Sequence, residues 1–434
     1  MIRMPLTSNS VGRMRRHPRR ILAAVGAIIL FTAGCKPQPP SSDAKTNMDQ
    51  AHAAPRPNII WLSVESVRAD HLGCYGYARD TTPQLDRLAA ESTVYERANS
   101  VTSWTLTAHA SMFTGLYPTA HRVTQPKDRL ADDYTTVAEV LAESGYQTAA
   151  VVAGPYLSRA HNLQQGFTYV DQSPIQHMKG ASADITNPDM ERAMFNYLRR
   201  HRATDRPFML FAYYWDTHSE YIPPAPFDTM FVPADAKPIK NVQFMPAFKL
   251  GRHISPAQLK YLVAQYDGEL RCTDGYIGRM FDLLRELELW ENTAIIVTAD
   301  HGEEFYEHGR NSHKNTVYVE SVRVPLIIKW PGSNPARRDD RLVSLVDLFP
   351  TVLELAGCTD PLPHSGHSLL APPPNDRAIF FELETLWSYR KRSTKEKWLE
   401  RTGWCTISNR RLLFTSVPSD ALLCVEFGGP RGVL

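Results

Sequence analysis

Acidic and imidazole side chains follow directly after apolar runs at several points of this 434-residue chain. The three places are Glu65 after 59–64, Asp216 and His218 after 207–215, and Asp300 and His301 after 293–299. If the runs are parallel strands of one sheet, their carboxyl ends share an edge. Carboxylates and an imidazole gathered there suit a divalent cation such as Zn²⁺ or Mn²⁺. Taken singly, each side chain is better explained as a cap of its strand or of a following helix, but the recurrence favours a site.

A second candidate for chemistry is the segment 103–115, a turn leading into a short helix that ends near Gly115. A helix N-terminus presents free N–H groups to an anion. The hydroxyl of Thr105 at that point could attack phosphorus or sulfur if a metal stabilised its alkoxide. Local sequence alone favours the simpler interpretation that Thr105 is an N-cap.

The elements that position these residues follow from hydrophobic patterning. Short apolar runs predict strands, and longer amphipathic stretches predict helices. The predicted strands are 59–64, 148–152, 207–215, 293–299 and 324–329, and the predicted helices are 82–91, 137–143, 256–287 and 345–355, the last with a break near Pro350. Alternation of this kind predicts an α/β fold with a large, mostly parallel sheet flanked by helices.

Composition and charge narrow the class. Hydrophobic residues make up 43% of the chain and charged residues 22%, which is typical of a globular protein with a sizeable core. The net charge of +2 gives no electrostatic reason to expect nucleic acid as a partner. The Cys residues after Cys35 are odd in number and show no CxxC spacing, so we expect free thiols rather than a zinc ribbon or a disulfide framework.

The N-terminus has the pattern of an export signal. Five Arg residues within 13–20 precede the apolar run 21–33, which is too short for the ~20 residues that span a bilayer. The sequence Thr-Ala-Gly-Cys at 32–35 resembles a bacterial lipoprotein processing site, which makes Cys35 the predicted lipidated residue. A plain signal peptide or an uncleaved anchor remains the alternative. We therefore expect a signal at 1–35 and a flexible linker at 36–56.

Many ordered motifs resemble the sulfatase family of the alkaline phosphatase superfamily. They are PNIIWLSVESVRADHLGCYG at 57–76, TPQLDRLA at 82–89, FTGLYP at 113–118, DTH at 216–218, YD at 266–267, DHGE at 300–303, EHG at 307–309, VPL at 324–326 and SLVDLFPT at 344–351. The resemblance implies an alkaline-phosphatase-like catalytic domain at 57–375. A divergent or truncated C-terminal subdomain is expected at 376–434.

The family's nucleophile motif differs here in an informative way. True sulfatases oxidise the Cys or Ser of a C/S-x-P-x-R motif to formylglycine. Counting back from Gly115 places Thr105 at that position, Thr107 at the Pro and His109 at the Arg. Oxidation of a Thr hydroxyl would give a ketone rather than the aldehyde, so we expect no formylglycine.

Glu65 followed by Ser66, together with a Thr nucleophile, is similar to the branch containing lipoteichoic acid synthases and phosphoethanolamine transferases. That branch forms a phospho-threonine intermediate and uses a divalent metal. The implied site has metal ligands (Glu65, Thr105, Asp300, His301), catalytic residues (Thr105, His218, His313, His109) and substrate-binding residues (Lys314, His218). The resemblance leaves the metal open among Mn, Zn, Ca and Mg.

The resulting expectation is a metal-dependent hydrolase of phosphate mono- or diesters, or of sulfate esters, working through a covalent Thr105 intermediate. The substrate would be a small molecule or a lipid or glycan ester. Two rivals are a phosphoryl transferase acting on envelope lipid or glycan, and a binding protein on a decayed sulfatase fold. The predicted location is the periplasmic face of a bacterial envelope, with a lipid anchor holding the protein to the membrane.

Overall fold

A computed structural model describes residues 56–176, 186–239, 254–314, 316–332, 335–359, 362–374 and 377–384, and the strands 402–408, 412–417 and 422–425. The predicted signal with Cys35, and the predicted linker up to residue 55, lie outside the described residues.

The centre of the fold is an eight-stranded sheet in the order β10-β2-β9-β6-β1-β5-β3-β4. Its strands are β1 (Asn58–Val64), β2 (Thr93–Asn99), β3 (Gln147–Val152), β4 (Tyr169–Asp171), β5 (Phe208–Tyr214), β6 (Thr293–Ala299), β9 (Leu326–Lys329) and β10 (Arg337–Ser344). Only β9 runs antiparallel to its neighbours, β6 and β2. Every residue of β1, β5 and β6 is buried, because helices cover both faces. The mostly parallel α/β architecture is therefore confirmed.

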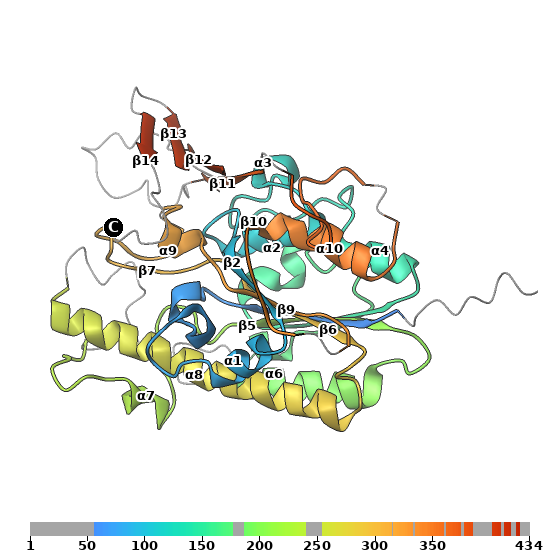
Figure 1. The fold of residues 1–434 in the computed structure, drawn as a ribbon, viewed down its shortest axis with the longest axis horizontal. Helices are drawn as coiled ribbons and strands as arrows, with labels where there is room; N and C mark the ends of the chain where they lie inside the picture. The colour runs from blue at the N-terminus through green and yellow to red at the C-terminus, as the bar shows by residue number, and fades with distance from the viewer. Residues whose placement is uncertain are drawn as a thin grey trace, which may run out of the picture. The chain divides into compact units, whose positions relative to one another are not determined.

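Helices form a layer on each side of the sheet (Figure 1). One layer contains α1 (Pro83–Ala89), α6 (Asn187–Asn196) and α8 (Pro256–Glu286), and the other contains α2 (Thr105–Thr114), α4 (Val137–Glu143) and α10 (Leu348–Leu355). The long helix α8 begins with a capping box in which Ser255 and Gln258 satisfy each other's backbone N–H groups. The predicted break at 345–355 falls earlier than Pro350, since a 3₁₀ turn at Leu345–Asp347 gives way to α10 and Pro350 lies in its first turn.

Several shorter elements lie between these helices and strands. They are α3 (Pro118–His121), α5 (Ser173–Gln176), α7 (Phe227–Met230), α9 (Val319–Val322), and the pair β7 (Glu304–Phe305) and β8 (Asn311–Ser312). Strand β11 (Ala378–Glu384) opens an antiparallel sheet with β12 (Thr402–Ser408), β13 (Leu412–Val417) and β14 (Leu422–Val425). This sheet falls in the predicted C-terminal subdomain, whose boundary stays a prediction. Across the described ranges, no helix has both the length and the apolar character needed to cross a bilayer.

Candidate active site and metal centre

The register of the central strands brings the predicted ligands to one edge of the sheet. Val64 pairs with Tyr214 of β5 on one side and with Ala299 of β6 on the other. The next residues, Glu65 and Asp300, therefore leave the sheet at the same level. Both are fully buried. The strand ends that the sequence pointed to do meet.

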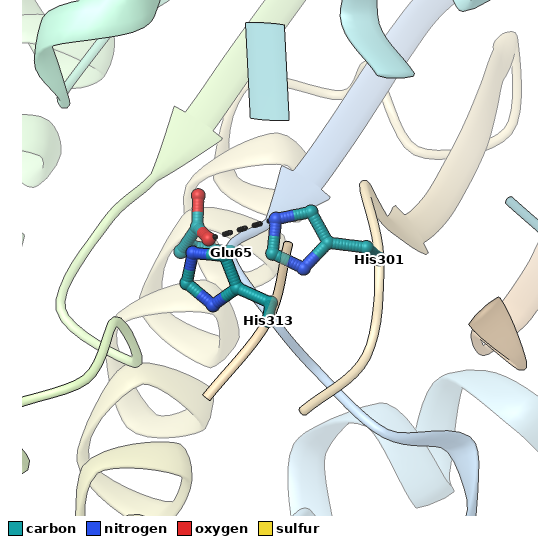
Figure 2. Close-up of side chains that lie close together, drawn as sticks. All are labelled: Glu65, His301 and His313. Carbon is teal, nitrogen blue, oxygen red and sulfur yellow. Dashed lines mark ion pairs between the residues drawn. The ribbon is translucent and has the colours of Figure 1, made fainter. Parts of the chain in front are cut away.

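Glu65, His301 and His313 form a compact group whose possible ligand atoms all lie within 4.8 Å of one another (Figure 2). The Nδ1 of His301 is 2.9 Å from the carbonyl of Gly302, so we assign its proton to that hydrogen bond. Its Nε2 faces Glu65 Oε1 at 3.2 Å and can offer a lone pair to a cation once the ring has released its second proton. An imidazole oriented this way by a backbone carbonyl is typical of a metal ligand.

Asp300 lies beside this group and carries an oxygen with an open coordination position. Its Oδ1 accepts from the backbone N–H groups of Ser66 and His301, both at 3.0 Å. Its Oδ2 is buried with no hydrogen-bond partner among the described residues and lies 3.5 Å from His301 Nε2. A buried carboxylate oxygen left unpaired is costly. The site thus fits a cation.

The pKa values in this group reflect crowding of like charges. Burial, together with the negative charge of Glu65, raises the pKa of Asp300 to about 6. Although burial alone would lower it, the carboxylates of Asp300 and Glu65 raise the pKa of His301 to about 9. For Glu65, burial opposes ionisation, but the charge and hydrogen bond of His301 hold its pKa below the usual value. Two neighbouring carboxylates kept ionised with one imidazolium form a site that a divalent cation would neutralise.

Thr105 is the first residue of α2, and Trp104 before it is the N-cap, so the N-cap interpretation of Thr105 is wrong. Its hydroxyl oxygen lies 3.2 Å from Glu65 Oε2 and 3.3 Å from His301 Nε2. No side chain among the described residues caps the helix, so its first N–H groups remain available to an anion. The predicted nucleophile and metal ligands are therefore together in space.

His109 lies one turn further along α2 and beneath the site. Its Nδ1 is 2.8 Å from the Thr105 carbonyl, and its Nε2 is 3.0 Å from the hydroxyl of Ser63. Burial lowers its pKa to about 4, so the ring is neutral. Both nitrogens are occupied inside the protein, an arrangement that holds Thr105. The predicted catalytic role of His109 remains a prediction.

Lys314 and His218 lie on the outer side of the group. Lys314 Nζ lies 4.5 Å from the centre of the Trp104 ring and 4.6 Å from that of Tyr156. The ring of His218 stacks on Trp215 at 4.0 Å and lies 5.1 Å from that of His313. Burial lowers the pKa of Lys314 to about 8 and that of His218 to about 3.

The structure differs from the sequence-based prediction at two residues: the placement of Asp216 was wrong, and Tyr213 was missed. Asp216 does not face the group: its carboxylate accepts hydrogen bonds from Thr186 and Asn187 at the start of α6. Tyr213 was not predicted, yet its hydroxyl donates to Glu65 Oε2. Side chains alternate between the two faces of a strand, so the sequence could have shown which face of β5 carries Tyr213. It could not have shown that the Tyr213 hydroxyl reaches Glu65.

The fold and site define an alkaline-phosphatase-like enzyme, and the comparisons identify its family. The model described as Sulfatase matches residues 57–358, and the chain belongs to the sulfatase family. By that membership it is a hydrolase of the sulfate- and phosphate-ester type.

Known relatives are distant but extend over most of the chain. The chain is 25% identical to the endo-4-O-sulfatase of Bacteroides thetaiotaomicron, covering 78% of this chain and 75% of that protein. It is 26% identical to the ulvan-active sulfatase of Formosa agariphila, covering 78% and 68%. The phosphonate monoester hydrolase of Agrobacterium radiobacter has a similar fold, with a TM-score of 0.69, 20% identity, and coverage of 86% and 89%.

Proposed function

We propose that this protein hydrolyses phosphate mono- or diesters, with sulfate esters as the related alternative, through a covalent ester on Thr105. The observation that carries the proposal is the position of the Thr105 hydroxyl. It lies at the N-terminus of a helix and within 3.3 Å of both Glu65 Oε2 and His301 Nε2. A nucleophile at this position would lie next to the substrate anion bound at the helix N-terminus and next to the ionised groups of the metal centre.

The residues that would hold a divalent cation are Glu65, Thr105, Asp300 and His301, with His313 close enough to join them. Such a cation would lower the pKa of the Thr105 hydroxyl and neutralise charge on the transferred group. The N–H groups at the start of α2 and the ammonium of Lys314 bind the anionic oxygens. Thr105 Oγ1 would release its proton and bond to phosphorus as the bond to the leaving oxygen breaks, and that oxygen would take up a proton to leave as the alcohol. Water would then cleave the threonine ester and return a proton to Thr105 Oγ1.

His218 is suited to the water step. Its Nδ1 lies 3.0 Å from the Ser219 carbonyl, which assigns the proton to that nitrogen and leaves Nε2 as an acceptor. Because burial lowers the pKa of His218 to about 3, the ring is neutral but only weakly basic, so its Nε2 is suited to accept a hydrogen bond from the attacking water. His218 would therefore orient the water in the second half of the reaction.

Charge balance favours diesters within the proposed class. A divalent cation balances Glu65 and Asp300, while burial raises the pKa of nearby Glu303 to about 8 and so favours its neutral form. Lys314 then supplies one excess positive charge near neutral pH. That charge matches the single negative charge of a phosphodiester, or of a sulfate monoester, better than the double charge of a phosphate monoester.

The deciding experiment uses purified protein with Mn²⁺ and matched aryl esters. We expect a higher kcat/KM for an aryl phosphodiester than for the aryl phosphate monoester, and a loss of about 10⁴-fold in the Thr105→Ala variant. Acid quenching followed by mass spectrometry should find a phosphate adduct on residue 105. Full activity of Thr105→Ala would contradict the proposal, and Thr105-dependent transfer only to added alcohols would indicate the transferase.

The cellular location is proposed from the sequence alone. We infer export to the periplasmic side of a bacterial envelope with lipid attached at Cys35. Mass spectrometry of the mature N-terminus should find diacylglyceryl on this cysteine. An N-terminus cleaved elsewhere and free of lipid would exclude the anchor.

A further inference from the structure

We infer that Ser66 is a positioning residue that holds the two carboxylates of the metal centre in place. The inference rests on the cation of the proposed function. Ser66 is fully buried and directly follows Glu65 at the end of β1. It contacts groups from three separate parts of the chain.

The hydroxyl and the backbone of Ser66 hold different carboxylates. Ser66 Oγ donates to Glu65 Oε1 at 2.6 Å, and Ser66 N–H donates to Asp300 Oδ1 at 3.0 Å. Glu65 and Asp300 leave neighbouring strands, so one residue restrains the ligands of both β1 and β6. With Oδ1 engaged, the oxygen of Asp300 left without a partner is Oδ2, which lies nearer the imidazole of His301.

The third contact reaches the ligand carried by a loop. Ser66 Oγ lies 3.4 Å from Nδ1 of His313, and Glu303 Oε2 lies 3.3 Å from the same nitrogen. Since the Ser66 hydrogen is donated to Glu65, its oxygen remains an acceptor for an Nδ1 proton. With its proton on Nδ1, the His313 ring keeps its lone pair on Nε2, where it can bind a cation.

The backbone of Ser66 is strained, and the surroundings maintain the strain. Its φ of 54° is left-handed, a conformation that is unfavourable for a residue with a Cβ. The hydroxyl of Tyr266 on α8 donates to the Ser66 carbonyl at 3.0 Å and accepts from the Arg68 N–H at 3.0 Å. Strain maintained in this way is characteristic of functional sites.

A purely structural turn would also explain a buried serine here, and two substitutions separate the explanations. Ser66→Ala removes the hydroxyl and keeps the strained backbone. Ser66→Gly removes the hydroxyl and relieves the strain, so it should stabilise the metal-free protein relative to Ser66→Ala. Ser92→Ala is the matched control. Ser92 is also fully buried, and its hydroxyl donates to the Leu88 carbonyl at 2.6 Å. It lies just before β2, at the amino ends of the strands and so away from the metal centre.

The test is titration of the chelator-treated protein with Mn²⁺ by calorimetry, alongside urea unfolding without metal. We expect both Ser66 variants to bind Mn²⁺ about 10- to 100-fold more weakly than the wild type, and Ser92→Ala to bind with unchanged affinity. Activity of Ser66→Ala should recover as Mn²⁺ is raised, which a folding defect would not allow. Wild-type affinity in both Ser66 variants overturns the inference alone, whereas a wild type that binds no Mn²⁺, Zn²⁺, Ca²⁺ or Mg²⁺ overturns the proposed cation as well.

Discussion

The ammonium group of Lys314 lies against two aromatic rings, 4.5 Å from the ring centre of Trp104 and 4.6 Å from that of Tyr156. Aromatic faces attract a cation without neutralising it. The backbone N–H of Lys314 also donates to the Ser103 carbonyl at 2.9 Å, which joins the Lys314 loop to the residues just before Thr105. A positive charge is thus placed at Trp104, the residue before the proposed nucleophile Thr105, where it could bind an anionic substrate.

The pKa of Lys314 predicts how substrate binding depends on pH. Because burial lowers this pKa to about 8, the ammonium loses its proton as pH rises through 8. We expect KM for the aryl diester to rise above that pH in the wild type. Lys314→Arg keeps its charge and should show a flat KM from pH 7 to about 9.5, given a guanidinium pKa above 12. A similar rise in both proteins would assign the effect to another group.

Removing the cation should destabilise the protein through Glu65 and Asp300. Binding of Mn²⁺ at 100 times its Kd should add about 2.7 kcal/mol to the free energy of unfolding. Asp300→Asn removes one of the crowded charges, so its metal-free form should be at least as stable as the wild type while gaining little from Mn²⁺. Thermal unfolding with and without chelator measures both quantities. An equal gain in the variant would mean that Asp300 does not bind the ion.

At the scale of elements, helix α2 carries the proposed nucleophile and is fixed at its far end. It ends at Gly115, whose φ of 68° suits glycine and whose missing side chain leaves room for Phe349 and His364. Ser111 of α2 contacts Nε2 of His121 at 2.8 Å, and His121 Nδ1 accepts from the Val123 N–H at 3.1 Å. The neutral ring of His121 therefore connects α2 to the loop after α3.

This connection predicts acid sensitivity. Burial lowers the pKa of His121 to about 3, whereas the unfolded chain binds the proton near pH 6.5. The unfolded state therefore gains protons first, and stability present above pH 6.5 is lost as pH falls toward 3. At pH 5 the loss should be about 2 kcal/mol. Urea unfolding at pH 7.5 and 5 should show a smaller fall in His121→Gln, while the control His201→Gln, at an exposed histidine, should match the wild type.

At the scale of the whole molecule, sequence patterning predicted the centre of the sheet better than its edges. Strands β1, β5 and β6 are continuous apolar runs, because helices cover both of their faces. Strand β10, with the sequence RRDDRLVS, and β2, with TVYERAN, mix charged and apolar residues and were not predicted. The antiparallel direction of β9 was also beyond prediction, because an apolar run does not specify which way a strand points.

The site was predictable to a similar degree. Glu65, Asp300 and His301 follow strand ends, so their meeting follows from topology. The proximity of His313 to that group depends on a loop that contains β7 and β8, and the contacts of Ser66 depend on one left-handed residue. Neither loop path nor backbone strain is encoded in a simple residue pattern.

A buried ion pair attaches β11 to the rest of the protein. Both carboxylate oxygens of Asp347 accept from the guanidinium of Arg377, at 2.5 and 2.6 Å, and both residues are almost fully buried. Arg377→Met leaves a buried charge unpaired and should lower the free energy of unfolding by about 3–5 kcal/mol. Arg199→Met, which breaks the exposed pair with Glu286, should cost at most about 1 kcal/mol. Equal, small losses in urea unfolding would show that water reaches Asp347.

The order in which the ligands occur along the chain has a consequence for biosynthesis. Glu65 belongs to an early part of the chain, and the residues that complete its group, His301 and His313, are synthesised more than 200 positions later. Contacts between such distant positions form slowly. A ribosome-bound fragment that ends before β6 cannot assemble the group, so the proposed cation could bind only after most of the polypeptide has been translated.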